Sequence, residues 1–234
     1  MSTVRETQAG SLERQSLLPV GWSLADLQRH LGDIPAERIR LDPPPGFATE
    51  ADVLRMEDIE GRLYELENGV LVEKPMGWYE SILATWVIHR LHSYLETNNL
   101  VQVLGEAGSL KILPGVVKIP DVSFISWSRF PKQKLPRCPI PNLIPDLVVE
   151  VLSDTNTMGE MQEKLKKYCE SGVRLIWYID PATRTAISYS SPIDSFDVPS
   201  DGEMDGMDVL PGLRMSLAQM FAHADRQAPG DDSG

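Results

Sequence analysis

Two acidic residues interrupt apolar runs of the kind that form buried β-strands. Glu150 lies within Leu147–Leu152, where every other residue is Leu or Val, and Asp121 precedes a second, mainly apolar run, Val122–Ile125. A buried carboxylate is costly unless it is paired, protonated or bound to a metal. Neighbouring strands lie about 4.8 Å apart, so the two carboxylates could converge on one cation. Magnesium takes oxygen ligands and keeps several waters, so the pattern predicts a site for Mg²⁺ or Mn²⁺.

The strand pattern by itself also fits a purely structural role for this pair of acids. Carboxylates at strand ends also accept hydrogen bonds from backbone N–H groups, or pair with an arginine, without any metal. The four histidines show no spacing typical of a metal site, and Cys138 and Cys169 form no CxxC motif. The carboxylates are therefore the candidate metal ligands, with the structural role as their alternative.

The first long helix is predicted at about Trp78–Glu96, and it carries a third acidic candidate. At 100° per residue, Glu80 falls about 60° from Leu83, inside the apolar face of this helix. Glu80 also lies in the first turn, where an acid can simply cap the helix or stabilise its dipole. Glu73 and Glu106 are weaker candidates for a third acid.

A second helix is predicted at about Gly159–Ser171, and it carries the candidate lysine. Lys164 lies about 60° from Met161 of the buried stripe, whereas Lys167 and Lys166 lie about 120° and 140° away. Lys164 is therefore the lysine best placed to reach the sheet. The alternative is an ordinary lysine at the edge of the stripe, with its ammonium in water.

The apolar periods around these residues predict one domain of mixed α and β structure. Asn68-Gly69 between two apolar runs is a strong hairpin signal, because the tight turn needs positive φ at both positions. A short terminal helix around Met220 follows an acidic loop. The predicted strands are, approximately, Leu63–Leu66, Val70–Val72, Leu100–Glu106, Ser109–Leu113, Ile119–Ile125, Asp146–Leu152, Arg174–Asp180 and Thr185–Tyr189.

We predict that residues 1–60 form an N-terminal extension and that residues 61–224 form the main domain. Residues 1 to about 20 are polar and are predicted to be disordered, as is the tail at 225–234. Two capping-box pairs, Ser23 with Asp26 and Thr49 with Asp52, predict two short helices in the extension. Pro43–Pro45 forms a stiff linker between them.

The net charge of −12 argues against a protein that coats nucleic acid nonspecifically, because phosphate contacts need Lys and Arg. The acids are concentrated after Ser191, however, and residues 126–145 contain none. We predict that the basic residues of this loop contact a phosphate backbone. They are Arg129, Lys132, Lys134 and Arg137.

Other features of the composition indicate a cytoplasmic protein. No apolar run approaches the roughly 20 residues that a membrane-spanning helix needs. The N-terminus has no apolar core of a signal peptide, and two cysteines provide no disulfide framework. We therefore expect no membrane partner, and the sequence leaves open whether the protein is a monomer or a homodimer.

Six segments carry motifs that resemble those of one known family. They are Pro120–Phe124, Pro145–Ser153, Lys164–Tyr168, Gly172-Val173, Trp177–Pro181 and Leu210–Leu213. Their order and spacing resemble the Uma-type restriction endonucleases of the PD-(D/E)XK nuclease superfamily, over about residues 60–222. The resemblance implies an α/β (α+β) fold with a restriction-endonuclease-like core, in which a central mixed sheet is flanked by helices.

The resemblance also implies a Mg²⁺- or Mn²⁺-dependent endonuclease that hydrolyses phosphodiester bonds in DNA. The family's metal-binding acids fall on Asp121 and Glu150, and its helix-borne glutamate falls on Glu80. The superfamily lysine, two residues after the second acid, is replaced by Leu152, and relatives with this gap imply a lysine from the next helix, which matches Lys164. This departure keeps a second hypothesis open, a nuclease fold without catalysis that serves as a binding or regulatory scaffold.

Overall fold

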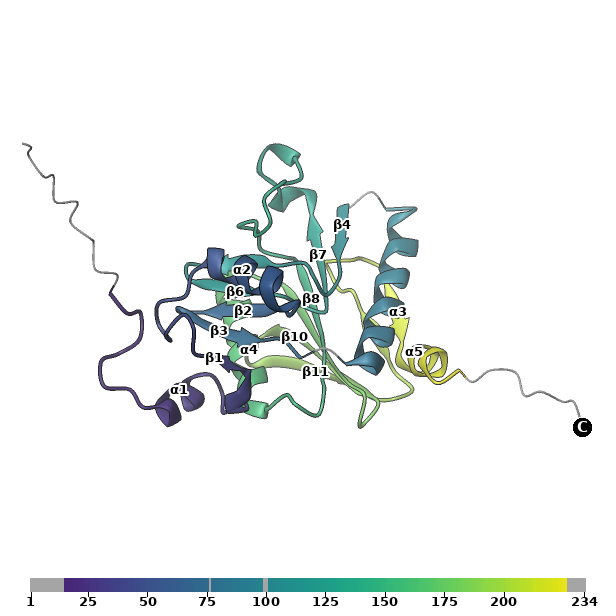
Figure 1. Ribbon diagram of the computed structural model, residues 1–234. Helices are drawn as coiled ribbons and strands as arrows, with labels where there is room; N and C mark the ends of the chain where they lie inside the picture. Colours follow the sequence, from purple (N-terminus) through teal and green to yellow (C-terminus); the bar gives the residue numbers. More distant parts are fainter. Residues whose placement is uncertain (1–14, 76, 99–100, 227–234) are drawn as a thin grey trace, which may run out of the picture.

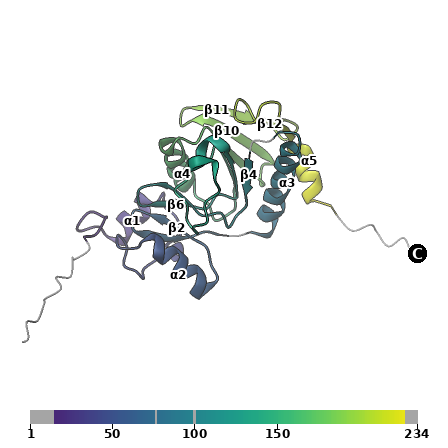
Figure 2. The same ribbon diagram turned by 90° about the horizontal axis from the view of Figure 1, so that it is seen from above.

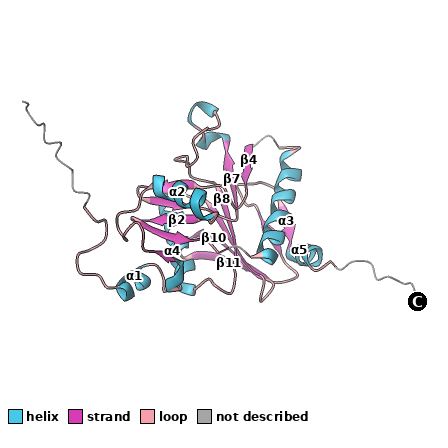
Figure 3. Cartoon of the chain, viewed as in Figure 1, coloured by secondary structure: helices cyan, strands magenta, loops and turns pink. Residues whose placement is uncertain are grey.

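The protein is described by a computed structural model that covers residues 15–75, 77–98 and 101–226. Two β-sheets lie next to each other, and the helices are arranged around them (Figures 1 and 2). Figure 3 shows the strands gathered in the centre, with helices at both sides. Within the described ranges, no helix is both long enough and apolar enough to cross a bilayer.

A six-stranded mixed sheet carries the two predicted acids. In spatial order its strands are β11 (Asp194–Val198), β10 (Thr185–Ser191), β9 (Leu175–Asp180), β8 (Leu147–Val151), β7 (Val122–Ser126) and β4 (Val101–Leu104). The β8–β9 pair is parallel and the other pairs are antiparallel, so the predicted mixed sheet is confirmed.

Helices cover both faces of this sheet, as predicted. Helices α3 (Trp78–Leu95) and α5 (Leu217–Ala224) pack on one face, where Trp177 and Val149 are fully buried. Helix α4 (Met158–Ser171) covers the opposite face and buries Tyr168 against it. Each large apolar side chain fully buried in this way stabilises the fold by roughly 1.5–3 kcal/mol.

A second, five-stranded sheet lies beside the first and was not expected as a separate sheet. Its order is β1 (Ile39–Arg40), β3 (Val70–Glu73), β2 (Tyr64–Glu67), β6 (Val116–Lys118) and β5 (Leu110–Leu113). Asn68 and Gly69 adopt φ values of 48° and 82° between β2 and β3, so the predicted hairpin is confirmed. Helix α2 (Glu50–Glu60) packs Val53 and Met56 on one face of this sheet.

The two short helices of the N-terminal segment begin where their caps predict. Helix α1 (Leu24–His30) follows Ser23, and α2 follows Thr49, each with its aspartate three residues later bonded back to the cap. Residues 1–14 and 227–234, most of the predicted disordered ends, lie outside the described residues. The N–H of Leu17 donates to the carbonyl of Gly46, which fixes the described start of the chain on the linker. The domain boundary at residue 60 stays a prediction.

Two local predictions were wrong. The strand predicted at Ile119–Ile125 begins only at Val122, as β7, and Ile119–Asp121 connects it to β6, which ends at Lys118 in the other sheet. Proline has no N–H for a strand ladder, which favours a break there. The predicted acidic loop instead contains β11 and a hairpin of β12 (Glu203–Asp205) and β13 (Arg214–Ser216). Strand β11 is mostly exposed at the sheet edge, so its sequence carries little apolar alternation.

The N-terminal segment is held to the large sheet's helix by a buried ion pair. The guanidinium of Arg38 donates two hydrogen bonds to the Glu160 carboxylate of α4, at 2.9 and 2.7 Å. Its Nε also donates to the carbonyl of Glu73, at 3.0 Å. Both side chains are less than a tenth exposed, so each charge depends on the other for its stability.

We expect Arg38→Ala to lower the free energy of unfolding by about 3–5 kcal/mol, because it leaves Glu160 buried without its cation. Urea denaturation monitored by circular dichroism measures this loss. Arg29→Ala is the matched control: Arg29 forms an exposed pair with Asp26, and its removal should cost less than about 1 kcal/mol. Equal losses in the two variants would contradict the role of Arg38.

Candidate functional site

Asp121 and Glu150 lie beside each other on the face of the large sheet that α4 covers. Strands β7 and β8 pair with Val122 opposite Val149, which places Asp121 next to Glu150 at the following position. Val122 and Val149 face α3, so their neighbours point to the α4 side. Both acids line one small pocket that is open to solvent.

The Asp121 carboxylate is fixed by two partners. Its Oδ2 accepts a hydrogen bond from the N–H of Val151, at 2.7 Å. Its Oδ1 lies 2.9 Å from the ammonium of Lys74, which follows β3 in the other sheet. One oxygen is therefore held by the backbone of β8, and the other by the long, flexible side chain of Lys74.

The Glu150 carboxylate is buried and is also held by two partners, both from α4. The hydroxyl of Tyr168 donates to its Oε1 at 2.5 Å, and the ammonium of Lys164 lies 3.3 Å from its Oε2. Burial raises the pKa of Glu150, the charge of Lys164 opposes this, and the nearby charge of Asp121 raises it again. The net effect is a raised pKa, which means that the surroundings of Glu150 disfavour its ionised form.

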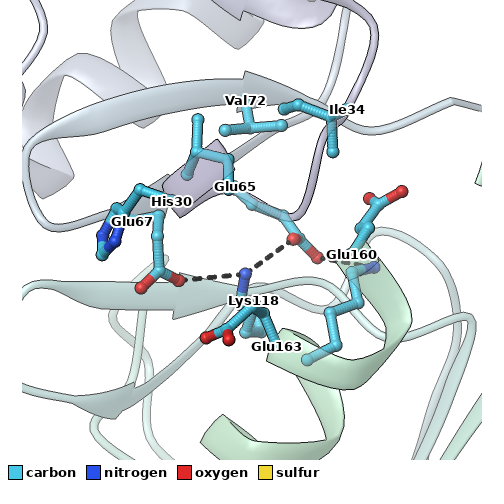
Figure 4. Close-up of a pocket in the computed structure, with 10 residues that line it drawn as sticks. His30, Ile34, Glu65, Glu67, Val72, Lys118, Glu160 and Glu163 are labelled. Atoms are coloured by element: carbon cyan, nitrogen blue, oxygen red, sulfur yellow. Dashed lines mark hydrogen bonds and ion pairs between the residues drawn. The ribbon is translucent and has the colours of Figure 1, made fainter. Parts of the chain in front are cut away.

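Lys164 links this pocket to a second group of buried charges. Its ammonium lies 3.4 Å from Oε1 of Glu65 on β2. The ammonium of Lys118 lies between the carboxylates of Glu65 and Glu67, at 3.1 and 3.2 Å (Figure 4). Lys167 completes the series at 3.2 Å from Glu67.

These groups form a series of neighbouring charges that alternate in sign except at one step. In order they are Lys74, Asp121, Glu150, Lys164, Glu65, Lys118, Glu67 and Lys167. The exception is the pair Asp121 and Glu150, which are neighbours in this series of described residues and are both acidic. A like-charge pair in a buried place favours a cation between its members.

The other acidic candidates are divided between two places. Glu80, in the first turn of α3, lines the same pocket as Asp121, as does Glu106. Helix α3 has Gly77 as its N-cap, and the carboxylate of Glu80 lies against that glycine, so close that a Cβ on Gly77 would overlap its Oε2. Glu73 instead pairs with Arg62 at 2.9 Å.

The basic loop lies at the other end of β7 from Asp121. Strand β7 has five residues, which span roughly 17 Å at about 3.3 Å per residue. Arg129 is engaged in the fold, because its Nε donates to Asp146 at 3.0 Å and its Nη2 to the carbonyl of Gly172 at 2.8 Å. The three other basic residues of the loop, Lys132, Lys134 and Arg137, are exposed.

Three residues of the site were missed by sequence analysis, each for a physical reason. Lys74 is a single lysine at a strand end, and nothing in its neighbours signals a partner 47 positions later. Glu65 alternates with apolar residues along β2, a pattern typical of a solvent-facing side chain, yet it faces α4 and is 3% exposed. Tyr168 was assigned only to the buried stripe, because periodicity does not reveal where a hydroxyl points.

Two comparisons place this arrangement among known proteins. The model of the Uma2 family, described as "Putative restriction endonuclease", matches residues 50–218, well over half of the chain. The chain belongs to this family. The resemblance inferred from the motifs is thereby confirmed, and family membership supports a nuclease.

The fold of the Uma2 chain is similar to that of a crystal structure described as "a putative nuclease belonging to DUF820 from Anabaena variabilis ATCC 29413". The TM-score is 0.62 at 19% sequence identity, over 70% of this chain and 92% of that chain. At this identity the likeness establishes the restriction-endonuclease-like fold alone. No curated protein matches the sequence.

The buried charges predict a specific pH dependence of stability. Burial acts to raise the pKa of Glu65, but the charges of Lys118 and Lys164 outweigh it and lower that pKa to about 2. Ionised Glu65 therefore stabilises the fold above its ordinary pKa of 4.5, and this contribution is lost as pH falls from 4.5 toward 2. Glu65→Gln should cost about 3 kcal/mol at pH 7, as expected for removing one partner of a buried pair.

Urea denaturation of the wild type and Glu65→Gln at several pH values between 2.5 and 7 tests this dependence. The difference between the two proteins should be largest above about pH 4.5 and should shrink at lower pH. Asp58→Asn, a change at an exposed acid of α2, should show no such trend. A difference that is constant with pH would contradict the assignment.

Proposed function

We propose that this protein is a metal-dependent endonuclease that hydrolyses phosphodiester bonds in DNA, with Asp121 and Glu150 as the ligands of Mg²⁺ or Mn²⁺. The observation that carries the proposal is that these two acids are direct neighbours, whereas acids and lysines alternate in the rest of the series of charges. Membership of the Uma2 family supports the same reaction class.

The donor set fits a hard divalent cation. Mg²⁺ prefers oxygen ligands, and in phosphate-processing sites it is held by one or two carboxylates, with waters and substrate phosphate completing its shell. Within the described residues no group of three or more His, Cys, Asp or Glu side chains forms a closed metal cage. An open site of two carboxylates agrees with a metal that must also accept a phosphate oxygen and a water.

The side chains of the pocket have separate roles in the proposed reaction. When bound, the metal would polarise the scissile phosphate and lower the pKa of a water molecule. Tyr168 and the Val151 N–H hold the two carboxylates in fixed orientations, at 2.5 and 2.7 Å. Lys164 keeps its positive charge, because Glu150 and Glu65 together outweigh burial and raise its pKa. It would orient the attacking water or neutralise charge that develops on the phosphate oxygens.

Two other predicted groups have more distant roles. Glu80 lines the pocket and would act as a further acid, directly on the metal or through a water. The basic loop is roughly 17 Å from Asp121, which corresponds to about five base pairs along B-DNA at 3.4 Å each. Lys132, Lys134 and Arg137 would thus contact phosphates away from the scissile bond, whereas Arg129 mainly supports the loop.

The second candidate function is a nuclease fold that binds a partner without catalysis. Two observations favour it: Leu152 occupies the usual lysine position, and the carboxylate oxygens of Asp121 and Glu150 already have protein partners. The net charge of −12 also disfavours binding to long stretches of nucleic acid. Cleavage by purified protein separates the two functions, provided that site variants control for contaminating nucleases.

We predict that the purified protein nicks or cuts plasmid DNA with Mg²⁺ or Mn²⁺ and that EDTA stops the reaction. Asp121→Asn and Glu150→Gln should each lower the rate by a factor on the order of 100 or more, because each removes a charge that the metal needs. Agarose-gel assays measure the rate, and thermal melts check that the variants are folded. Equal cleavage by wild type and Asp121→Asn would attribute the activity to a contaminant and favour the scaffold.

Lys164→Ala should lower the cleavage rate more than it lowers metal affinity, because its ammonium acts on water or phosphate rather than on the ion. Lys166→Ala is the matched control on the same helix: Lys166 is exposed and should leave the rate within about twofold of wild type. Rates under saturating Mn²⁺, with Mn²⁺ affinity from calorimetry, separate the two effects. A rate for Lys164→Ala equal to that of Lys166→Ala would exclude the assigned role.

A further inference from the structure

Lys74 is a buried lysine of the candidate pocket to which the proposed reaction assigns no role. Its side chain is 5% exposed, and its backbone N–H is fixed by the carbonyl of Leu63. Its ammonium donates to the carbonyl of Ile119 at 2.6 Å and lies 2.9 Å from Oδ1 of Asp121. The lysine therefore crosses from the small sheet to the start of β7 and neutralises one proposed metal ligand.

The position of Lys74 makes it a competitor for that ligand. Oδ2 of Asp121 is committed to the Val151 N–H, so Oδ1 is the oxygen that carries the remaining acceptor capacity. A lysine ammonium is a compact charge on a flexible stem, and it can change partners without any change in the backbone. Glu80 and Glu106 line the same pocket and offer other acceptors within it.

The charge balance shows why this competition matters. Asp121 and Glu150 each have a lysine beside the carboxylate, Lys74 for Asp121 and Lys164 for Glu150. A divalent cation that binds Oδ1 of Asp121 must displace the Lys74 ammonium, and the displaced charge then needs another anion in a partly buried place. A bound phosphodiester supplies such an anion next to the metal.

We propose that Lys74 is a built-in counter-ion that holds Asp121 in the metal-free protein, yields it to the metal, and then pairs with the phosphate of the bound nucleic acid. This inference rests on the proposed function, because it assigns the metal to Asp121 and Glu150. Lys74 thereby makes the metal bind weakly alone and more tightly when an anionic substrate is present. By linkage, the metal must strengthen substrate binding by the same factor.

The test measures Mn²⁺ affinity by calorimetry, with Mn²⁺ as the probe and no nucleic acid present. Lys74→Met keeps the length of the side chain and removes its charge, and it should bind Mn²⁺ about tenfold or more tightly than wild type. The gain should vanish in Lys74→Met/Asp121→Asn. Lys111→Met is the control, because Lys111 pairs with Glu50 at the edge of the small sheet, and it should match the wild type.

The cleavage rate provides the opposite readout. At saturating Mn²⁺, Lys74→Met should cut plasmid DNA more slowly than wild type, although it binds the metal more tightly. If Lys74 had only a structural role, Lys74→Met would lower both the Mn²⁺ affinity and the cleavage rate, or neither of them. Unchanged or weaker Mn²⁺ affinity in folded Lys74→Met overturns the inference, and so does an unchanged cleavage rate.

Two further measurements keep the test decisive. If Lys74→Met does not fold, Lys74→Gln replaces it, since its amide can still donate to the carbonyl of Ile119. In the wild type, the ¹⁵N signal of the Lys74 ammonium should shift when Mg²⁺ is added, and its constancy would overturn the inference without any variant.

The outcomes also separate this inference from the proposed function. Suppose that Mn²⁺ binds at Asp121 and binds more tightly in Lys74→Met, but that no protein cleaves DNA. This result would support the competition for Asp121 but overturn the phosphate role of Lys74 and the endonuclease. Metal-dependent cleavage by the wild type, with unaltered Mn²⁺ affinity in Lys74→Met, would retain the endonuclease and overturn the counter-ion. Absence of Asp121-dependent Mn²⁺ binding in both proteins would overturn both.

Discussion

Burial of charge requires partners, and this requirement organises the space between the two sheets. Acids on β2, on β8 and just before β7 meet lysines from α4, from β6 and just after β3, and each lysine lies within about 3.5 Å of at least one acid. Removal of one member leaves a neighbour uncompensated, so the cost would spread along the series. Replacing buried ion pairs by apolar side chains of similar volume is often neutral for stability or stabilising, so stability alone does not require these charges. In the proposed metal site, a cation would join the series between Asp121 and Glu150.

The arrangement depends on how the chain passes between the sheets. Residues Ile119–Asp121 connect β6 of the small sheet to β7 of the large one, so Lys118 and Asp121 both lie at the border between the two sheets. The N–H of Ile119 donates a hydrogen bond to the side-chain Oε1 of Glu65 at 3.2 Å, which fixes this crossing. A second connection, the Arg38–Glu160 ion pair, holds the N-terminal segment to α4. The small sheet thus forms one wall of the site rather than an appendage to it.

Rigid and adjustable contacts are divided between the two acids. Glu150 is held by two side chains of α4, and its neighbours Val149 and Val151 are buried in the core on the other face. Asp121 is held on one side by a backbone N–H and on the other by a flexible lysine. In the proposed metal site, Glu150 would be a fixed ligand and Asp121 an exchangeable one, so a metal could bind reversibly without a change of backbone geometry, because only the lysine has to move.

The sequence by itself determined the local elements and the two central acids. Apolar periodicity, capping boxes and the Asn68-Gly69 turn act over a few residues, and so β8, α4, α1 and α2 were predicted close to their observed bounds. The same local reasoning placed Glu150 on a buried strand and selected Lys164 over Lys166. The tertiary structure alone decided that Lys74 meets Asp121, that Glu65 faces α4 rather than solvent, and that Arg129 serves the fold. These outcomes depend on how two sheets stack. A strand's own alternation separates its two faces but does not say what covers the polar one, and only the stacked layers bring together partners that are distant in sequence.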